Sequence, residues 1–127
     1  MVAVVKKTGH VPPQIVENAV GTEIEWLIDR RDGATNFELW KLRITPGGRI
    51  PKHYHSDIEH EQYVLKGKYD VGIGDKVYQV KFGDSLYFPA GTVHWYENHG
   101  EGYAQFLCIA PKKEEDEAGV SGKYQPR

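Results

Sequence analysis

Apolar and polar residues alternate over many short segments of this chain. Between residues 37 and 45, for example, Trp40, Leu42 and Ile44 alternate with polar or charged residues. Successive side chains of a β-strand point to opposite faces, so this segment predicts a strand with one buried face and one face in water. No stretch keeps the period of an amphipathic helix over several turns. The pattern therefore predicts an all-β protein.

Glycines and prolines divide the chain into short segments. The 14 glycines and 7 prolines mostly stand between runs rich in valine, isoleucine and aromatic residues, which is typical of strands joined by tight turns. The Pro46-Gly47-Gly48 sequence is expected to end one strand before the next begins. Short strands at this close spacing favour a barrel or a two-sheet jelly roll. We expect strands at residues 24–29, 37–45, 49–55, 60–65, 68–73, 77–82, 85–89, 93–97 and 103–110.

The chain of 127 residues is expected to form a single domain. Residues 1–22 are predicted to form an arm or an edge strand, because the two prolines at positions 12 and 13 cannot donate hydrogen bonds within a central strand. The barrel is predicted to span residues 23–111. Residues 112–127 hold acidic residues and glycines but little apolar content, so we expect a disordered tail there.

Composition and charge narrow the class of partner. The formal net charge is -2, and the lysines are scattered along the chain, so neither nucleic acid nor an anionic membrane is an expected partner. We expect a small-molecule substrate instead. The apolar start of the chain is interrupted at Lys6, too early for a signal peptide or a membrane span. Cys108 is the only cysteine, which fits a reducing cytoplasm.

Three of the six histidines fall within eight residues, at His53, His55 and His60. Side chains two residues apart on a strand share a face, so His53 and His55 can converge on one point if the segment is extended. His60 begins the next predicted strand and can return to the same point. Neutral imidazole is a good ligand for zinc, copper, iron and nickel. The cluster therefore indicates a metal site.

Two spaced motifs give the chain a resemblance to the cupin superfamily. The first motif places the histidines between two glycines, with five, four and six residues in the gaps; it runs Gly47, His53-x-His55, His60, Gly67. The second motif has gaps of five, two and three residues; it runs Gly83, Pro89-x-Gly91, His94, Asn98. The resemblance implies a double-stranded β-helix, the jelly-roll barrel of the cupins, with one metal per chain. Homodimers are also an expectation from it.

The resemblance implies that His53, His55 and His94 bind the metal, and it leaves the fourth ligand to be chosen. His60 stands where the first motif usually has a glutamate, and Glu59 fits a looser spacing of that motif. Strand alternation puts Glu59 on the opposite side from His60. We therefore predict His60 as the fourth ligand, as in small single-domain cupins with four histidine ligands.

Four neutral imidazoles make a metal centre more positive than three imidazoles and a carboxylate, so we expect an anionic or chelating substrate. Manganese or iron is the favoured metal, with zinc, nickel or copper as alternatives. With iron or manganese, the resemblance suggests a metal-dependent oxidoreductase with dioxygenase-type chemistry on a small organic compound. With nickel or zinc, it suggests Lewis-acid isomerisation or ring-opening of a sugar acid. A non-catalytic ligand-binding module is the third hypothesis.

Residues next to the predicted ligands are candidates for the pocket wall. Alternation puts Gln62 on the side of His60 and Tyr96 on the side of His94. Either Tyr96 or Tyr87 could donate a proton to a bound substrate. Cys108 is predicted to be a small buried residue rather than a redox group.

Overall fold

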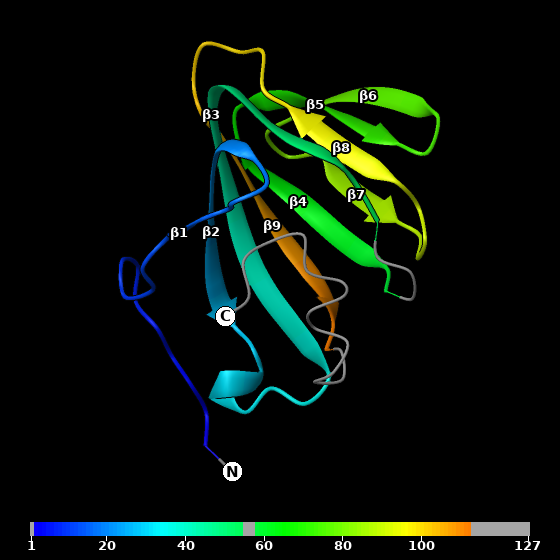
Figure 1. Cartoon of the computed structure of the whole chain (residues 1–127). Coiled ribbons are helices and arrows are strands. Elements are labelled where there is room, and N and C mark those ends of the chain that lie inside the picture. The colour runs from blue at the N-terminus through cyan, green and yellow to red at the C-terminus, as the bar shows by residue number, and fades with distance from the viewer. Residues whose placement is uncertain (1, 55–57, 113–127) are drawn as a thin grey trace.

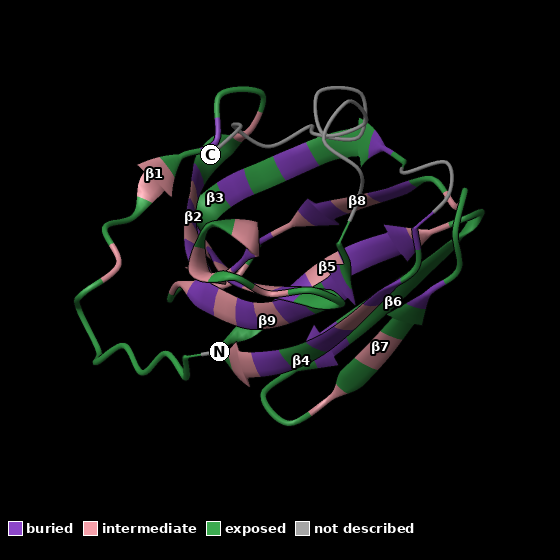
Figure 2. Cartoon of the chain, turned by 90° about the horizontal axis from the view of Figure 1, so that it is seen from below, coloured by how far each residue is buried: buried purple, intermediate pink, exposed green. Residues whose placement is uncertain are grey.

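The computed structural model describes residues 2–54 and 58–112, and the regular secondary structure of this part of the chain is almost entirely β. Figure 1 shows the strands curling around a common interior, and Figure 2 shows buried and exposed residues alternating along them. The predicted all-β jelly-roll barrel is therefore confirmed. The described strands are β1 (Gln14–Ile15), β2 (Val20–Ile28), β3 (Phe37–His53), β4 (His60–Lys66), β5 (Lys68–Ile73), β6 (Lys76–Lys81), β7 (Ser85–Phe88), β8 (His94–Glu97) and β9 (Ala104–Pro111).

The strands pair antiparallel in the order β6-β5-β8-β3-β9-β4-β7, and β2 pairs with β3 and with the short edge strand β1. Strand β3 connects the two halves of the barrel. Its first part pairs with β9 from Phe37 to Ile44, and its last part pairs with β8 from Arg49 to His53. No described helix has the length and the apolar composition needed to cross a membrane.

The expected strand break at Pro46-Gly47-Gly48 is wrong, because β3 continues through these residues and changes its partner there. Gly47 has φ of 81°, which residues with a side chain rarely adopt. Asn98 holds the corner from the other side: its carbonyl accepts from Gly47 N and its backbone N donates to Gly48 O, both at 2.9 Å. The glycines bend the strand and leave its hydrogen bonding intact.

The core follows the alternation expected from the sequence. Trp40, Leu42 and Ile44 are buried, whereas the residues between them are half-exposed. One row of inward-facing residues crosses four neighbouring strands in register: Trp26 of β2 lies opposite Trp40 of β3, Trp40 opposite Cys108 of β9, and Cys108 opposite Gln62 of β4. This row runs from β2, near the edge of the sheet, to the interior beside His60.

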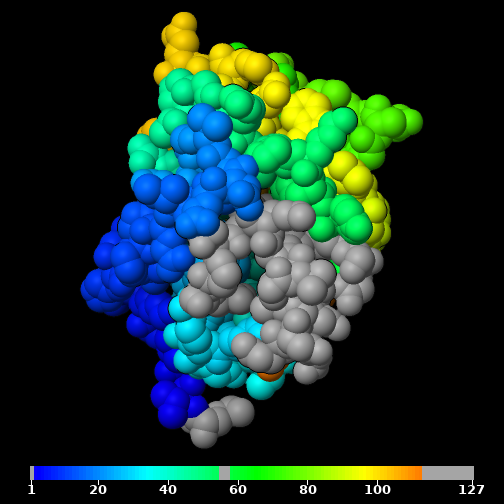
Figure 3. Space-filling model, in the orientation of Figure 1, coloured from blue at the N-terminus to red at the C-terminus, as the bar shows by residue number. Residues whose placement is uncertain are grey.

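Residues 2–13, which we call the N-terminal arm, run along the edge of β2 and form part of the molecular surface (Figure 3). The Lys6 ammonium donates to Leu27 O at 2.8 Å and pairs with the Asp32 carboxylate at 2.9 Å. Asp32 belongs to a short 3-10 helix, η1 (Arg30–Asp32), that follows β2. A long lysine side chain therefore ties the arm to the end of β2.

Candidate metal centre and active site

Three of the four predicted histidine ligands meet inside the barrel. His53 ends β3, His60 begins β4 and His94 begins β8, and all three side chains are buried. The ring centroids of His53 and His94 are 4.1 Å apart, and those of His60 and His94 are 5.9 Å apart. His53 lies directly opposite His94 in the β3–β8 ladder. Strand register therefore brings together histidines that are far apart in the sequence.

In two of these imidazoles, a backbone carbonyl determines that the Nδ1 atom carries a proton. The Nδ1 atom of His53 lies 2.9 Å from Pro51 O, and that of His94 lies 3.0 Å from Thr92 O. A carbonyl oxygen can only accept a hydrogen bond, so Nδ1 carries the proton in both rings. When such a ring is neutral, its Nε2 atom is the one that carries the lone pair. This is the arrangement found for histidines that bind metals.

Burial keeps the third imidazole neutral. It lowers the pKa of His60 to about 3, mainly by desolvation, with smaller contributions from His94 and His53. Desolvation also lowers the pKa of His94. The rings of Trp40 and His60 make a T-shaped contact, with their centroids 5.7 Å apart, and this contact supports the His60 ring. A neutral imidazole can bind a metal at physiological pH without first losing a proton.

The structure separates His60 from Glu59 as strand alternation predicts. His60 is buried, whereas Glu59 is exposed. A hydrogen bond with Glu59 raises the pKa of the Glu61 carboxyl, so these two acidic side chains lie beside each other. The choice of His60 rather than Glu59 as a metal ligand remains a prediction, but only His60 faces the other two histidines.

The described residues include three of the four histidines of the predicted metal site. The fourth predicted ligand, His55, lies outside the described residues. Among the residues that are described, no group of three or more His, Cys, Asp or Glu side chains is arranged so that it could hold a metal ion. The neutral, buried imidazoles fit a transition metal by their donor chemistry. The four-histidine centre therefore stays a prediction.

A polar pair lies beside the histidines, in the predicted pocket wall. Gln62 and Tyr96 are both buried, and Gln62 Nε2 donates a hydrogen bond to Tyr96 Oη at 2.7 Å. The ring centroids of Tyr96 and His94 are 5.9 Å apart. Gln62 Nε2 also lies 3.5 Å from Cys108 Sγ, and burial raises the pKa of this thiol. Cys108 is thus a protonated residue of the core.

The other candidate proton donor, Tyr87, is excluded by its position. Its side chain is 56% exposed, because it lies on the outer face of β7 next to the inward-facing Phe88. Phe88 itself was missed from the sequence, although its ring lies 5.0 Å from that of His94. Alternation along residues 85–88 could have identified Phe88 as an inward-facing residue. In the structure, Phe88 lies opposite the buried His60 in the ladder between β7 and β4.

Aromatic side chains close the interior beyond the polar pair. The ring of Tyr96 stacks on Phe106 at 5.1 Å, and Phe106 contacts Tyr69 at 5.3 Å. Burial raises the pKa of the Tyr69 hydroxyl, so it stays protonated. The Gln62–Tyr96 pair therefore packs against a largely apolar part of the interior, from which water is excluded.

Comparison with known proteins agrees with this architecture. Residues 40–110 match the family model described as Cupin domain. The structure of the polyketide cyclase RemF from Streptomyces resistomycificus is similar to this chain, with a TM-score of 0.80 and 30% identity, and the match covers 98% of this chain and 96% of RemF.

Two curated relatives match over a smaller share of their own length. A germin-like protein of Arabidopsis thaliana, subfamily 2 member 2, is 28% identical over 78% of this chain and 49% of its own. Polyketide synthase CurC of Streptomyces cyaneus is 29% identical over 63% of this chain and 54% of its own. The chain thus spans about half the length of these two relatives. Since the family model covers more than half of the chain and the fold agrees with it, this protein belongs to the cupin family.

Proposed function

We propose that this protein is a metal-dependent cyclase that closes a ring in a small, enolisable compound with several carbonyl groups. The observation that carries this proposal is the similarity to the polyketide cyclase RemF over almost the whole of both chains. The match to polyketide synthase CurC points to the same class of substrate. The buried imidazoles and the Gln62–Tyr96 pair provide suitable chemistry.

The proposed ligands of the metal are His53, His55, His60 and His94. A bound divalent ion would supply Lewis-acid polarisation of the substrate's carbonyl and enol oxygens. Manganese or iron is the favoured ion on the sequence prediction, and zinc, nickel and copper also bind neutral imidazole. Two adjacent carbonyl oxygens of the substrate match the expected preference for a chelating compound.

Tyr96 is the proposed proton donor. In ring closure the enol carbon forms a bond to a second carbonyl carbon, and the enol oxygen loses its proton as it becomes a carbonyl. The π electrons of the second carbonyl move onto its oxygen, which then takes up a proton. The Gln62 amide donates to Tyr96 Oη, so the phenol oxygen is the acceptor in that bond and its own proton is directed to another group. Gln62 therefore orients the Tyr96 hydroxyl. The aromatic wall restrains the substrate and limits access of water.

The experiment uses protein purified without an immobilised nickel column. Elemental analysis identifies the metal, and a linear triketone with alternating carbonyls serves as the substrate probe. Ring closure with loss of one water gives a resorcinol, which is followed by its ultraviolet absorbance, and an oxygen electrode monitors the same reaction. We expect metal-dependent formation of the resorcinol without oxygen consumption. Consumption of one oxygen molecule per turnover would instead support the dioxygenase prediction.

The matched variants are Tyr96→Phe and Tyr63→Phe. Removing the proton donor is expected to lower kcat by about a hundredfold or more, whereas Tyr63 is 45% exposed on the outer face of β4 and its loss should leave kcat unchanged. Tight binding of the triketone without any turnover would contradict the cyclase proposal and favour a ligand-binding module.

A further inference from the structure

The outer face of four neighbouring strands, β3, β9, β4 and β7, carries a group of apolar side chains. They occupy the positions between the buried residues of these strands, so alternation turns them away from the barrel interior (Figure 2). Four of them are 37–60% exposed, and the others are half-buried. We call this surface the outer patch; its members are Phe37, Leu39, Tyr63, Tyr87, Leu107 and Ile109.

Strand register makes the outer patch continuous. Leu39 of β3 lies opposite Ile109 of β9, and Leu107 of β9 lies opposite Tyr63 of β4. Neighbouring strands are about 4.8 Å apart, so opposite side chains on one face lie within contact distance. Single apolar residues on a surface need no explanation, but a contiguous group of them marks an interaction site.

Strand β4 has an acidic end within this surface. Glu61 lies opposite Ile109 on one side and Tyr87 on the other, and the exposed Glu59 stands before it on the same face. A hydrogen bond with Glu59 raises the pKa of the Glu61 carboxyl, as expected where two acidic groups lie side by side. A cation brought to this end of β4 would relieve the repulsion between them.

The other end of β4 is basic. Lys66 lies opposite Gln105 of β9 after a shift in register, and its ammonium nitrogen lies 4.5 Å from the centroid of the Tyr103 ring. The two cations nearby on β3, Lys41 and Arg43, already pair with carboxylates of β2. Within the described part of the chain, neither the acidic nor the basic end of β4 forms an ion pair.

We propose that the outer patch is the interface between two copies of this chain. A two-fold axis across the strands, between the levels of Leu107 and Ile109, turns one sheet onto the other and reverses its strand direction. Leu107 of each copy then lies over Ile109 of the other, and the acidic end of β4 faces Lys66 of the second copy. Stacked sheets pack about 10 Å apart, a distance that apolar side chains from the two faces fill.

A second copy fits this surface because the outer patch is self-complementary. Its unpaired charges of opposite sign lie at opposite ends of one strand, and a two-fold axis across that strand brings unlike ends together. The inner face of the same strands carries His60 and Phe88. The interface and the proposed cyclase centre therefore use different faces of the sheet, and neither proposal depends on the other.

Sedimentation equilibrium of the full chain tests the interface. We expect the wild type to have twice the mass of one chain and Ile109→Glu to have the mass of one chain, because two carboxylates would be buried in an apolar contact. Val77→Glu is the matched control and should stay dimeric, since Val77 is 62% exposed on β6 and lies opposite Gly72 of β5, outside the four strands. Circular dichroism verifies that both variants keep the fold. A monomeric wild type, a folded Ile109→Glu that dimerises or a monomeric Val77→Glu would overturn the proposal.

A charge exchange tests the two-fold arrangement. Glu61→Lys and Lys66→Glu should each raise the dimer Kd roughly tenfold, because the axis repeats the altered contact twice. The double variant carries the same charges with the two ends exchanged, so its dimer Kd should match that of the wild type. A double variant that dimerises no better than the single variants would overturn the arrangement, since unlike charges would then not meet across the axis.

Discussion

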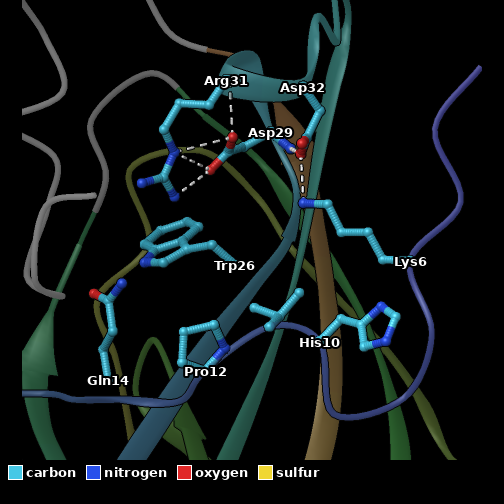
Figure 4. A pocket seen from close by; sticks show the side chains of 9 residues that line it. Lys6, His10, Pro12, Gln14, Trp26, Asp29, Arg31 and Asp32 are labelled. Carbon is cyan, nitrogen blue, oxygen red and sulfur yellow. Dashed lines mark hydrogen bonds and ion pairs between the residues drawn. The ribbon is translucent and has the colours of Figure 1, made fainter. Parts of the chain in front are cut away.

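The chain builds the histidine cluster in a different way from the pocket between the N-terminal arm and the end of β2. We call the latter the arm pocket; Lys6, Trp26 and Arg31 are among the residues that line it (Figure 4), and the Trp26–Trp40 pair lies between it and the histidines. His53, His60 and His94 come from three strands and are buried, and burial lowers the pKa of His60 and of His94. The arm pocket depends on one turn and one long lysine side chain, and its charges are paired near the surface. Charge is avoided in the first region and compensated in the second. The first region should therefore depend on the integrity of the core, and the second on local contacts and salt.

The strongest test of this comparison removes the side chain that lies between the two regions. Trp40 is buried, and its ring contacts both Trp26 and His60. Trp40→Ala is expected to lower the free energy of unfolding by about 3–5 kcal/mol, because it leaves a large cavity in the core. Urea denaturation measures the loss. Trp95→Ala, at a half-exposed position, should cost clearly less, and equal losses would mean that Trp40 is not a central support.

Acid should destabilise the histidine cluster before it affects the arm pocket. Burial lowers the pKa of His60 to about 3 in the folded protein, from its ordinary value of 6.5. Between about pH 6.5 and about pH 3, therefore, the unfolded chain binds a proton on His60 and the folded chain does not. The free energy of unfolding of the metal-free protein should fall as the pH drops through this window, by at most ~1.4 kcal/mol per pH unit for this group. The stability that depends on neutral His60 is thus fully present above about pH 6.5 and is lost as the pH falls toward about 3.

Denaturation series between about pH 7 and pH 4 on the wild type and His60→Gln measure this effect. The variant should show a flatter dependence on pH. The hydrogen bond from Lys6 lowers the pKa of Asp32 from 3.8, so the stabilisation from this carboxylate is complete above that value and is lost only in stronger acid. An unchanged pH dependence in His60→Gln would show that His60 does not titrate as its burial requires.

A smaller effect is expected from the polar pair in the interior. Gln62→Leu removes the hydrogen bond to Tyr96 and should cost about 1–3 kcal/mol, because the phenol oxygen loses a buried partner. Combining this change with Tyr96→Phe in a double-mutant cycle gives the coupling energy, which we expect to be about 1 kcal/mol. A coupling energy near zero would argue against the orienting role of Gln62.

The smallest effect belongs to the lysine that ties down the arm. Lys6→Met should lower the free energy of unfolding by less than about 1 kcal/mol, as is typical of partly exposed ion pairs. It should nevertheless make the arm more accessible to limited proteolysis, since the contacts to Leu27 O and Asp32 are both lost. Lys7→Met is the control, and identical proteolysis of the two variants would contradict the anchoring role.

Strand alternation predicted the larger part of the fold and of the interior. It put Gln62 beside His60 and Tyr96 beside His94, because in a strand one residue determines the face of every second one. It could not predict the partner change of β3, since the bend at Pro46-Gly47-Gly48 depends on hydrogen bonds with Asn98. Tyr87 is a different case, because alternation along β7, applied to Phe88, also places Tyr87 on the outer face.

The arm pocket could not be predicted from local patterns. Its shape depends on Lys6 reaching Leu27 and Asp32, a contact across 26 residues that no periodicity encodes. The sequence Arg30-Arg31-Asp32-Gly33 is typical of a turn, and Gly33 adopts a left-handed conformation there, with φ of 93°. Sequence patterns indicate where the chain turns, but not which distant side chain will pack against the turn.

Strand β3 should also determine how the protein opens. It runs from Phe37 to His53 and pairs with β2 and β9 in one half of the barrel and with β8 in the other. Neither half can separate from the other while this strand keeps its ladders. Amide hydrogens in the middle of β3 should therefore exchange with solvent only when the whole domain unfolds, whereas those of β1 exchange through local fluctuations. A single strand thus makes the barrel one cooperative unit.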